Sequence, residues 1–136
     1  MLPEERCSQL LQARGQSVIE LCAAAPLLVI MILLFLDLLA IIIGASTNHS
    51  IVVNASRAAA IQSSIKSAEA AASIIVEGTG ESTFIRSISL TGFSYKDSPA
   101  RLVRVQTTVV TGLPCPLAGW SEVRITEEAV QSILTE

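Results

Sequence analysis

The sequence is poor in charged, aromatic and metal-ligating side chains. Of its 136 residues only 15% are charged and 4% aromatic, and nine Lys and Arg stand against 12 Asp and Glu. No basic stripe that would suit a nucleic acid is present. The single histidine, His49, and the three cysteines, Cys7, Cys22 and Cys115, lack the spacing of a zinc site or of a disulfide framework. We therefore expect neither a nucleic-acid binder nor a structural metal site.

Catalytic groups are also missing as a set. The chain contains no acid–base dyad and no nucleophile paired with a histidine, and we expect Glu122, Glu127 and Glu128 to be solvated surface acids. The segment Gly78-Thr79-Gly80 lacks a preceding strand and a third glycine, so it does not predict a nucleotide site. The sequence predicts no enzyme activity, no cofactor, no metal ion and no small-molecule substrate.

Apolar side chains, by contrast, are in excess. They make up 51% of the chain, the mean hydropathy is +0.59, and much of the excess lies in one run, Leu21–Gly44, which holds a single charge, Asp37. As a helix this run would be about 36 Å long, enough to cross a hydrocarbon core of about 30 Å. Its Leu, Ile, Val and Phe side chains favour insertion by about 4–9 kcal/mol, whereas Asp37 opposes it by at most about 3 kcal/mol. The run predicts a membrane-spanning helix.

The run is about twice as long as the apolar core of a cleaved secretory signal. We therefore favour an uncleaved anchor at this end over a secreted domain released near Ala45 or Ser46. Two arginines precede the run and the next basic residue is Arg57, so we expect a cytoplasmic N-terminus and an extracytoplasmic C-terminal part.

A glycine and a glutamate stand before the apolar run, five positions apart. A carboxylate at the mouth of a membrane helix is unfavourable in lipid unless it finds a partner. A cut after Gly15 would give Gln16 a new α-amino group, on the same helix face as Glu20. In a packed array, the amine of one subunit could then neutralise Glu20 of the next. A plainer alternative is that Gly15 interrupts a helix start and Glu20 favours a first helical turn through the helix dipole.

This pattern resembles the cleavage site of type IV prepilins, and more narrowly the TadE-like minor pseudopilins of tight-adherence (Tad) pili. The family has a glycine before the cut, a glutamate as the fifth mature residue, and an early proline and a late aspartate in the apolar run. Gly15, Glu20, Pro26 and Asp37 occupy those places, and the stretch from Asn54 to Ala60, with Arg57, matches the family beyond the run. The resemblance covers about residues 13–60.

The resemblance implies a minor pseudopilin for assembly of a Tad-type pilus, held in the bacterial cytoplasmic membrane. It implies a prepilin peptidase that cuts between Gly15 and Gln16, and other pilins and pilus platform proteins as partners, with Asn54 and Arg57 as motif residues of the stalk. The alternative is an uncleaved single-span membrane protein with a small extracytoplasmic interaction domain.

Two residues of the apolar run have roles that the sequence leaves open. Asp37 follows Glu20 by about 25 Å of helix, which places it near the outer interface. It is either a solvated interfacial acid or a contact for a basic group on a neighbouring subunit. Pro26 is expected to kink or locally open the helix, which membrane helices tolerate.

Beyond the run, apolar residues recur at steps of three and four from Ile51 to Val76, which predicts a helix whose stripe is mostly alanine. Residues 48–50 are a possible interruption, with His49 as a solvated surface residue. Gly78 is expected to end the helix. Strands are expected over 84–91, 102–111 and 122–126, with a loop over 92–99 and an irregular segment over 112–116. A short terminal helix capped by Thr126 follows. Cys115 is expected to be an idle thiol or to form an intermolecular disulfide.

The expected fold class is α+β, in which a transmembrane helix continues into a long amphipathic stalk helix packed on a small antiparallel sheet. The predicted organisation has four segments: a leader over 1–15, a transmembrane helix over 16–44, a stalk helix over 45–77, and a β-rich head with a short C-terminal helix over 78–136.

Overall fold

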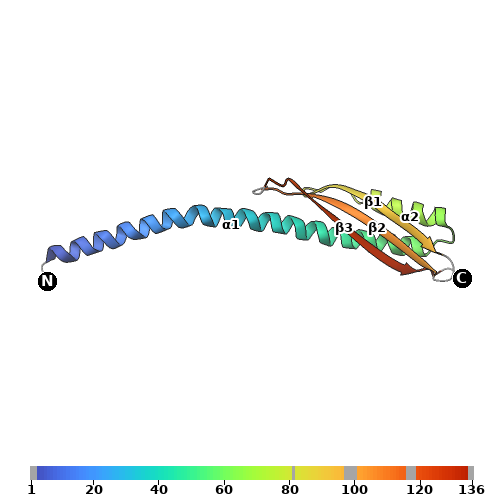
Figure 1. Cartoon of the computed structure of the whole chain (residues 1–136), viewed down its shortest axis with the longest axis horizontal. Helices are drawn as coiled ribbons and strands as arrows, with labels where there is room; N and C mark the ends of the chain where they lie inside the picture. Colours follow the sequence, from blue (N-terminus) through green and yellow to red (C-terminus); the bar gives the residue numbers. More distant parts are fainter. Residues whose placement is uncertain (1–2, 81, 97–100, 116–118, 135–136) are drawn as a thin grey trace. The chain divides into compact units, whose positions relative to one another are not determined.

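The structure, a computed structural model, describes residues 3–80, 82–96, 101–115 and 119–134, with side chains from Ile19 onwards. Two helices come first in the chain and three strands follow (Figure 1). The helices are α1 (Pro3–Ala60) and α2 (Ile65–Gly78), and the strands are β1 (Ile85–Lys96), β2 (Leu102–Gly112) and β3 (Glu122–Ser132). The predicted α+β class is confirmed.

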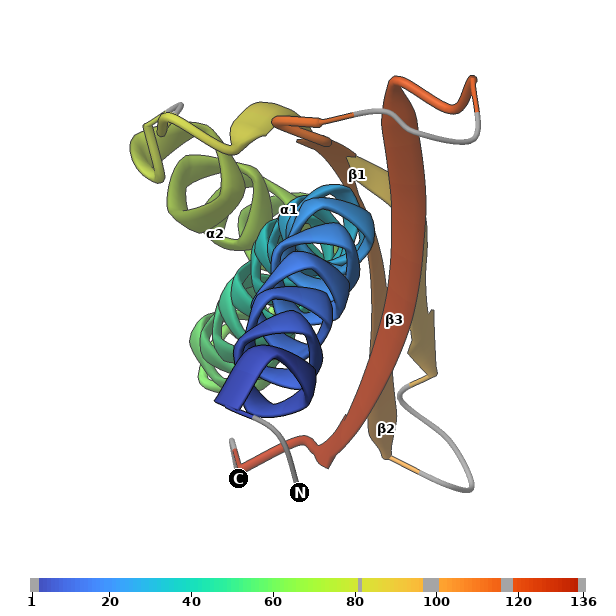
Figure 2. The ribbon, with the colours of Figure 1, turned by 90° about the vertical axis from the view of Figure 1, so that its left-hand side faces the viewer.

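The chain divides after Leu36 into two units, residues 1–36 and 37–136. The first unit contributes only the N-terminal part of α1. The second holds the rest of α1, α2 and the sheet, and within it both helices lie on one face of the sheet (Figure 2).

The sheet is a simple meander. Its strands lie in the order β1-β2-β3 and both pairs are antiparallel, so β2 is central. The predicted alternation along β2 is confirmed, because Val103, Val105 and Val109 are fully buried while Arg104 is exposed. The buried face of β2 therefore carries the core, and the opposite face carries polar side chains.

The core joins both helices to β2. Its α1 side is formed by Ile51, Val52, Ala55 and Ala59, and its α2 side by Ala68, Ala72 and Val76. Four of these residues are alanines with no exposed surface, so the backbones approach closely. The alanine stripe that the sequence predicted is thus part of the core.

Three expectations about the elements are corrected. The helix expected over 45–77 is two helices, because α1 ends at Ala60 and Ser64 starts α2 as its N-cap, accepting a hydrogen bond from Ser67 N–H at 3.3 Å. Ile61 and Ile65, expected in the buried stripe, are 61% and 55% exposed on either side of this break. Residues 48–50 do not interrupt α1. The end of the second helix at Gly78 is confirmed.

The strands are longer than expected at both sheet edges. β1 continues to Lys96, through part of the loop expected over 92–99, whose residues 97–99 lie outside the described part of the chain. The prediction of a terminal helix capped by Thr126 is wrong. Residues 122–132 pair with β2 along its whole length, from Gly112↔Glu122 to Leu102↔Ser132. The hydrogen bonds of this ladder replace those that a helix would have made.

Candidate functional site

The described side chains of the first unit form an apolar helix surface. Between Ile19 and Leu36, eleven large hydrophobic side chains are 42–71% exposed (Ile19, Leu21, Leu27, Leu28, Val29, Ile30, Met31, Ile32, Leu34, Phe35 and Leu36). Such a continuous apolar surface is unfavourable in water and favourable in lipid. By length and composition, α1 is able to cross a membrane, and it is the one such helix among the described residues.

The predicted processing site lies within the helical backbone of α1. Gly15 and Gln16 precede the apolar surface, and their side chains lie outside the described part of the structure. Glu20 is exposed, and within the described part of the chain no basic group pairs with its carboxylate. Among the described side chains, the acid at the start of the apolar surface therefore has no compensating positive charge.

α1 continues as one helix through Pro26. Proline has no amide proton, so the carbonyl of Cys22, four residues earlier, lacks its usual helical partner. Pro26 thus frees one backbone carbonyl within the apolar surface and does not end the helix.

Asp37 opens the second unit and is buried against the turn between β2 and β3. The side chain is only 9% exposed, and its Oδ1 accepts a hydrogen bond from the Cys115 backbone N–H at 2.9 Å. Of the two roles that the sequence left open for Asp37, the solvated interfacial acid is wrong, because the carboxylate is buried and accepts a hydrogen bond from the backbone of its own chain. A contact with a neighbouring subunit stays a prediction. Cys115 is a free thiol in this chain, as is Cys22. Of the irregular segment expected over 112–116, Pro116 lies outside the described residues.

Two turns further along α1, Gly44 touches the end of β2. A Cβ placed on Gly44 would overlap the side chain of Thr111, whose Cβ and Cγ2 would be only 3.2 and 3.3 Å away. Ala40, between Asp37 and Gly44, is 1% exposed. Small side chains at these positions let the helix backbone approach the sheet.

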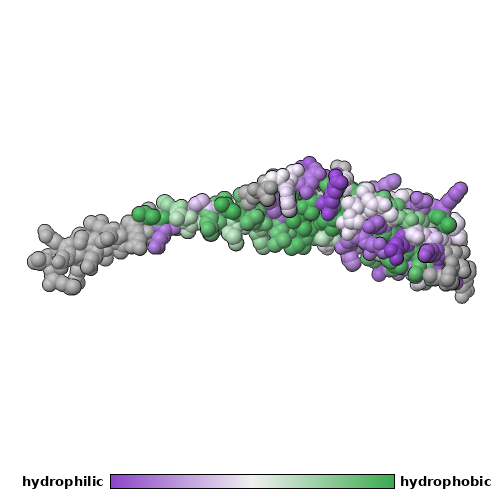
Figure 3. Space-filling view, in the orientation of Figure 1, coloured by the Kyte–Doolittle hydropathy of each residue, from purple (hydrophilic) through white to green (hydrophobic). Residues whose placement is uncertain are grey.

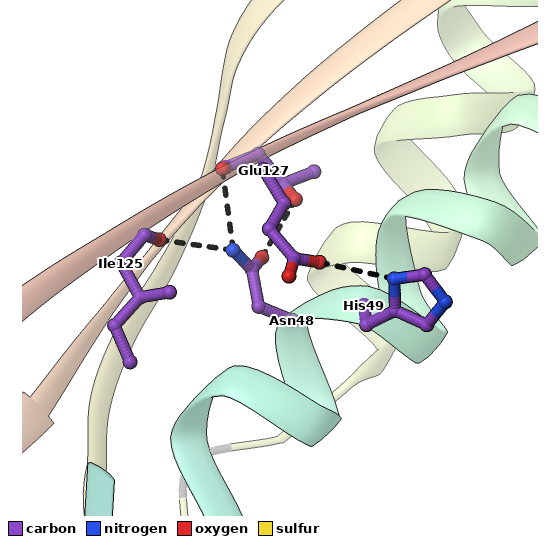
Figure 4. A network of polar contacts seen from close by, with 5 residues as sticks. Asn48, His49, Ile125 and Glu127 are labelled. Atoms are coloured by element: carbon purple, nitrogen blue, oxygen red, sulfur yellow. Dashed lines mark hydrogen bonds and ion pairs between the residues drawn. The ribbon is translucent and has the colours of Figure 1, made fainter. Parts of the chain in front are cut away.

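Asn48 forms hydrogen bonds that join α1 to β2 and β3. It has no exposed surface, its Nδ2 donates to the Ile125 carbonyl at 2.9 Å, and its Oδ1 accepts from the Thr107 hydroxyl at 2.7 Å (Figure 4). A longer contact of 3.5 Å joins Nδ2 to the Thr107 carbonyl. Sequence reasoning treated Asn48 only as a possible interruption of the helix. The missed signal was its spacing of four residues from Gly44, which continues a line of small or polar residues on an apolar helix.

His49 and Glu127 lie at the rim of this network (Figure 4). His49 is 72% exposed at its side chain, in agreement with the predicted surface position, and its Nδ1 lies 3.3 Å from Glu127 Oε2. That oxygen is shielded from solvent and receives no hydrogen bond of good geometry from the described residues. Glu127, expected to be a solvated acid, is instead a half-buried acid on the helix side of β3.

Asn54 and Arg57 lie on the outside of α1. Both are exposed, and their spacing of three places them on one helix face, while Ala55 and Ala59 on the other side belong to the core. Arg57 stands in the last turn of α1, where a cation suits the helix dipole. The polar residues of the motif thus remain accessible, and its alanines are used for packing.

The site is therefore a helix with two kinds of surface. In the first unit the described side chains form an apolar surface, and Glu20 has no partner among them. In the second unit one side of the helix packs on the sheet. Figure 3 shows the apolar surface gathered on α1 and mixed, largely hydrophilic surface over the sheet. Among the described residues, no group of three His, Cys, Asp or Glu side chains could hold a metal ion.

No protein-family model matches the chain, and neither a curated protein nor a solved structure shows significant similarity to it.

Proposed function

We propose that the chain is a minor pseudopilin that takes part in assembly of a Tad-type pilus in the bacterial cytoplasmic membrane. One observation carries the proposal: an exposed acid, Glu20, stands at the start of an apolar helix surface, and none of the described side chains pairs with it. An acid in that place is unfavourable in lipid unless a positive group pairs with it. The α-amino group that a cut after Gly15 would create on a neighbouring subunit supplies such a group, and the sequence resemblance points to the same cut.

In this proposal the chain is inserted with its N-terminus in the cytoplasm and its sheet outside. A prepilin peptidase cuts between Gly15 and Gln16, and the apolar helix then packs beside other pilins, with platform proteins as further partners. The contacts of Asn48 and Gly44 fix the sheet to residues 37–60 of α1. Those contacts support a rigid subunit whose exposed Asn54 and Arg57 are available to neighbours.

The second candidate is an uncleaved single-span membrane protein with a small extracytoplasmic interaction domain. It is favoured by Asp37, whose carboxylate is bound by the Cys115 N–H of its own chain and so needs no neighbour. A secreted domain released near Ala45 is disfavoured, because such a cut would remove Asp37, Ala40 and Gly44 from the unit into which they pack.

The deciding experiment is the intact mass and N-terminal sequence of the protein extracted from the membrane of its host. A chain that starts at Gln16 supports the pseudopilin, and one that retains residues 1–15 supports the uncleaved protein. The variant Gly15→Leu should block processing, because a large side chain would stand at the cut. Unchanged processing of that variant would show that the cut, if any, lies elsewhere.

The role of Glu20 is tested separately from cleavage. Glu20→Ala should be cleaved like the parent chain but fail to enter filaments, because the new α-amino group loses its acid. Glu69→Ala, which removes another exposed acid from α2, is the matched control and should assemble normally. Normal assembly of Glu20→Ala would exclude the proposed pairing.

A further inference from the structure

The turn between β2 and β3 is held against the first residue of the second unit. Its base is closed by Leu113 N–H donating to the Ser121 carbonyl at 3.0 Å, and Cys115 N–H donates to Asp37 at 2.9 Å. Next to that base Trp120 is 72% exposed. The turn that is bound to Asp37 therefore presents a large aromatic side chain to its surroundings.

The part of α1 that lies beside this turn is itself apolar on its outer side. Asp37, Ala40 and Gly44 face the sheet and the turn, while the side chains between them are 39–53% exposed (Leu38, Leu39, Ile42 and Ile43). The next exposed residues along the helix are polar, at Ser46, His49 and Ser50. The change from apolar to polar exposed surface therefore falls between Ile43 and Ser46, beyond the point where the turn is attached.

The exposed surface of α1 within the second unit gives the level of that attachment. Asp37 precedes Ile43, the last of these exposed aliphatic residues, by about 9 Å of helix. The turn is therefore tied to α1 just before its exposed surface changes from apolar to polar. In a membrane protein such a change marks the boundary between the hydrocarbon core and the lipid headgroups.

We propose that the described ends of the β2–β3 turn, residues 113–115 and 119–121, lie in the headgroup layer of the membrane and that Trp120 is an interfacial anchor whose partner is lipid. Tryptophan favours this layer because its ring is apolar and its indole N–H is polar. Lipid is the occupant to which the surface points, because the exposed side chains of α1 next to the turn are large and aliphatic (Leu38, Leu39, Ile42 and Ile43), and the residues that precede them in the sequence are apolar as well. The inference rests on α1 crossing a bilayer, which both candidate functions require, and not on pilus assembly.

Trp120 is the only tryptophan of the chain, so its fluorescence reports on this turn alone. The full chain is reconstituted into phosphatidylcholine–phosphatidylglycerol vesicles that carry a nitroxide quencher either near the headgroup or near the end of the acyl chain. We expect the shallow label to quench Trp120 at least about twofold more than the deep label, as an interfacial ring requires. Iodide in the aqueous phase should quench it less than it quenches free tryptophan.

Two relocated tryptophans provide the controls, each combined with Trp120→Phe. Leu28→Trp, in the apolar surface, should be quenched most by the deep label. Val130→Trp lies ten residues along the chain from Trp120, about 33 Å in extended conformation, on the exposed face of β3, and should respond to iodide alone.

The outcomes separate the inference from the proposed function. If Leu28→Trp is not quenched by lipid labels, α1 does not enter the bilayer, and both candidate functions fail together with the inference. If Leu28→Trp is quenched by the deep label while Trp120 responds only to iodide, the interfacial anchor alone is excluded. Shielding of Trp120 from iodide without quenching by lipid would mean that a second copy of the chain covers it, which would also overturn the proposal.

Discussion

Replacing Asn48 by alanine should loosen the attachment of the sheet to α1. The substitution removes two short hydrogen bonds, at 2.7 Å from the Thr107 hydroxyl and at 2.9 Å to the Ile125 carbonyl. The Thr107 hydroxyl and the Ile125 carbonyl would each lose their hydrogen bond to Asn48. A polar group left unpaired inside a protein costs about 1–3 kcal/mol of stability. The 3.5 Å contact to the Thr107 carbonyl is too long to add much. We expect a loss of about 2–4 kcal/mol in the free energy of opening β2 and β3.

Native-state hydrogen exchange of the full chain in detergent measures this loss, because it reports the opening of individual segments. At one factor of ten for each 1.4 kcal/mol, the slowest amides of β2 and β3 should exchange roughly 30- to 700-fold faster in Asn48→Ala. Amides in the first unit should be unchanged, since they lie outside the packed core.

Two further variants make this test specific to the network. His49→Ala alters the neighbouring residue, which is 72% exposed at its side chain, and should change the opening free energy by no more than about 0.5 kcal/mol. Thr107→Val removes the hydroxyl that Asn48 accepts from, so the double variant should lose less than the sum of the two single losses. Additive losses, or a loss in Asn48→Ala no larger than in His49→Ala, would refute the reasoning.

Three other substitutions test separate contacts. Gly44→Ala should lower the thermal midpoint, since overlap with Thr111 costs about 1–3 kcal/mol and exceeds the gain of about 1 kcal/mol in helix propensity. Gly78→Ala, where an added Cβ meets nothing within 4 Å, should not lower it, and equal effects would contradict the close approach. Asp37→Ala should speed exchange of the Cys115 amide at least about tenfold, because a hydrogen bond to a charged group contributes about 1.5–3 kcal/mol. Asp37→Asn, which keeps an acceptor oxygen, should restore most of the protection, and unchanged exchange in the alanine variant would exclude the bond. Arg104→Ala breaks an ion pair with Glu128 whose side chains are 60% and 39% exposed, so calorimetry should show a loss below about 0.5 kcal/mol.

The local sequence pattern predicted the structure correctly where one face of an element is buried and the other is exposed. β2 alternates between Val103, Val105 and Val109 on one side and Arg104 on the other, and the structure follows that alternation. The apolar surface of residues 19–36 was equally clear, because a run of large aliphatic side chains in a short chain cannot all be buried.

The local sequence pattern gave a wrong prediction where pairing with a distant segment decides the secondary structure. Residues 127–134 contain glutamates, alanine and leucine that favour a helix, yet most of them lie in β3, because the whole strand pairs with β2. The break between the two helices has a different cause. Ser63 and Ser64 offer hydroxyls that compete for backbone hydrogen bonds, and Ser64 caps α2 with one of them. The stripe of small residues continues across the break, so its periodicity concealed the turn.

The contacts of the candidate site could not be predicted, because their partners lie far away in the sequence. Asp37 meets Cys115, Gly44 meets Thr111 and Asn48 meets Thr107. The positions on α1 nevertheless carry a signal. Asp37, Ala40, Gly44 and Asn48 follow one another at steps of three and four, and they are the small or polar members of an otherwise aliphatic segment. That line marks the helix face that meets protein, whereas the large aliphatic residues mark the face that does not.

This division of α1 into two faces also changes the energetics of Asp37 in a membrane helix. An isolated acid at the centre of a membrane-spanning helix opposes insertion by about 3 kcal/mol. Near the interface the cost of inserting the same acid is smaller. In the structure Asp37 turns toward the sheet and accepts the Cys115 N–H, so the outer face at this level is formed by Leu38, Leu39 and Ile42. If α1 crosses a bilayer, as we propose, a charge that would hinder insertion of a bare helix points away from the exposed aliphatic side once the second unit has folded. In that case folding of the second unit and insertion of these helical turns should stabilise each other, because folding shields the acid and lipid covers the exposed aliphatic side chains.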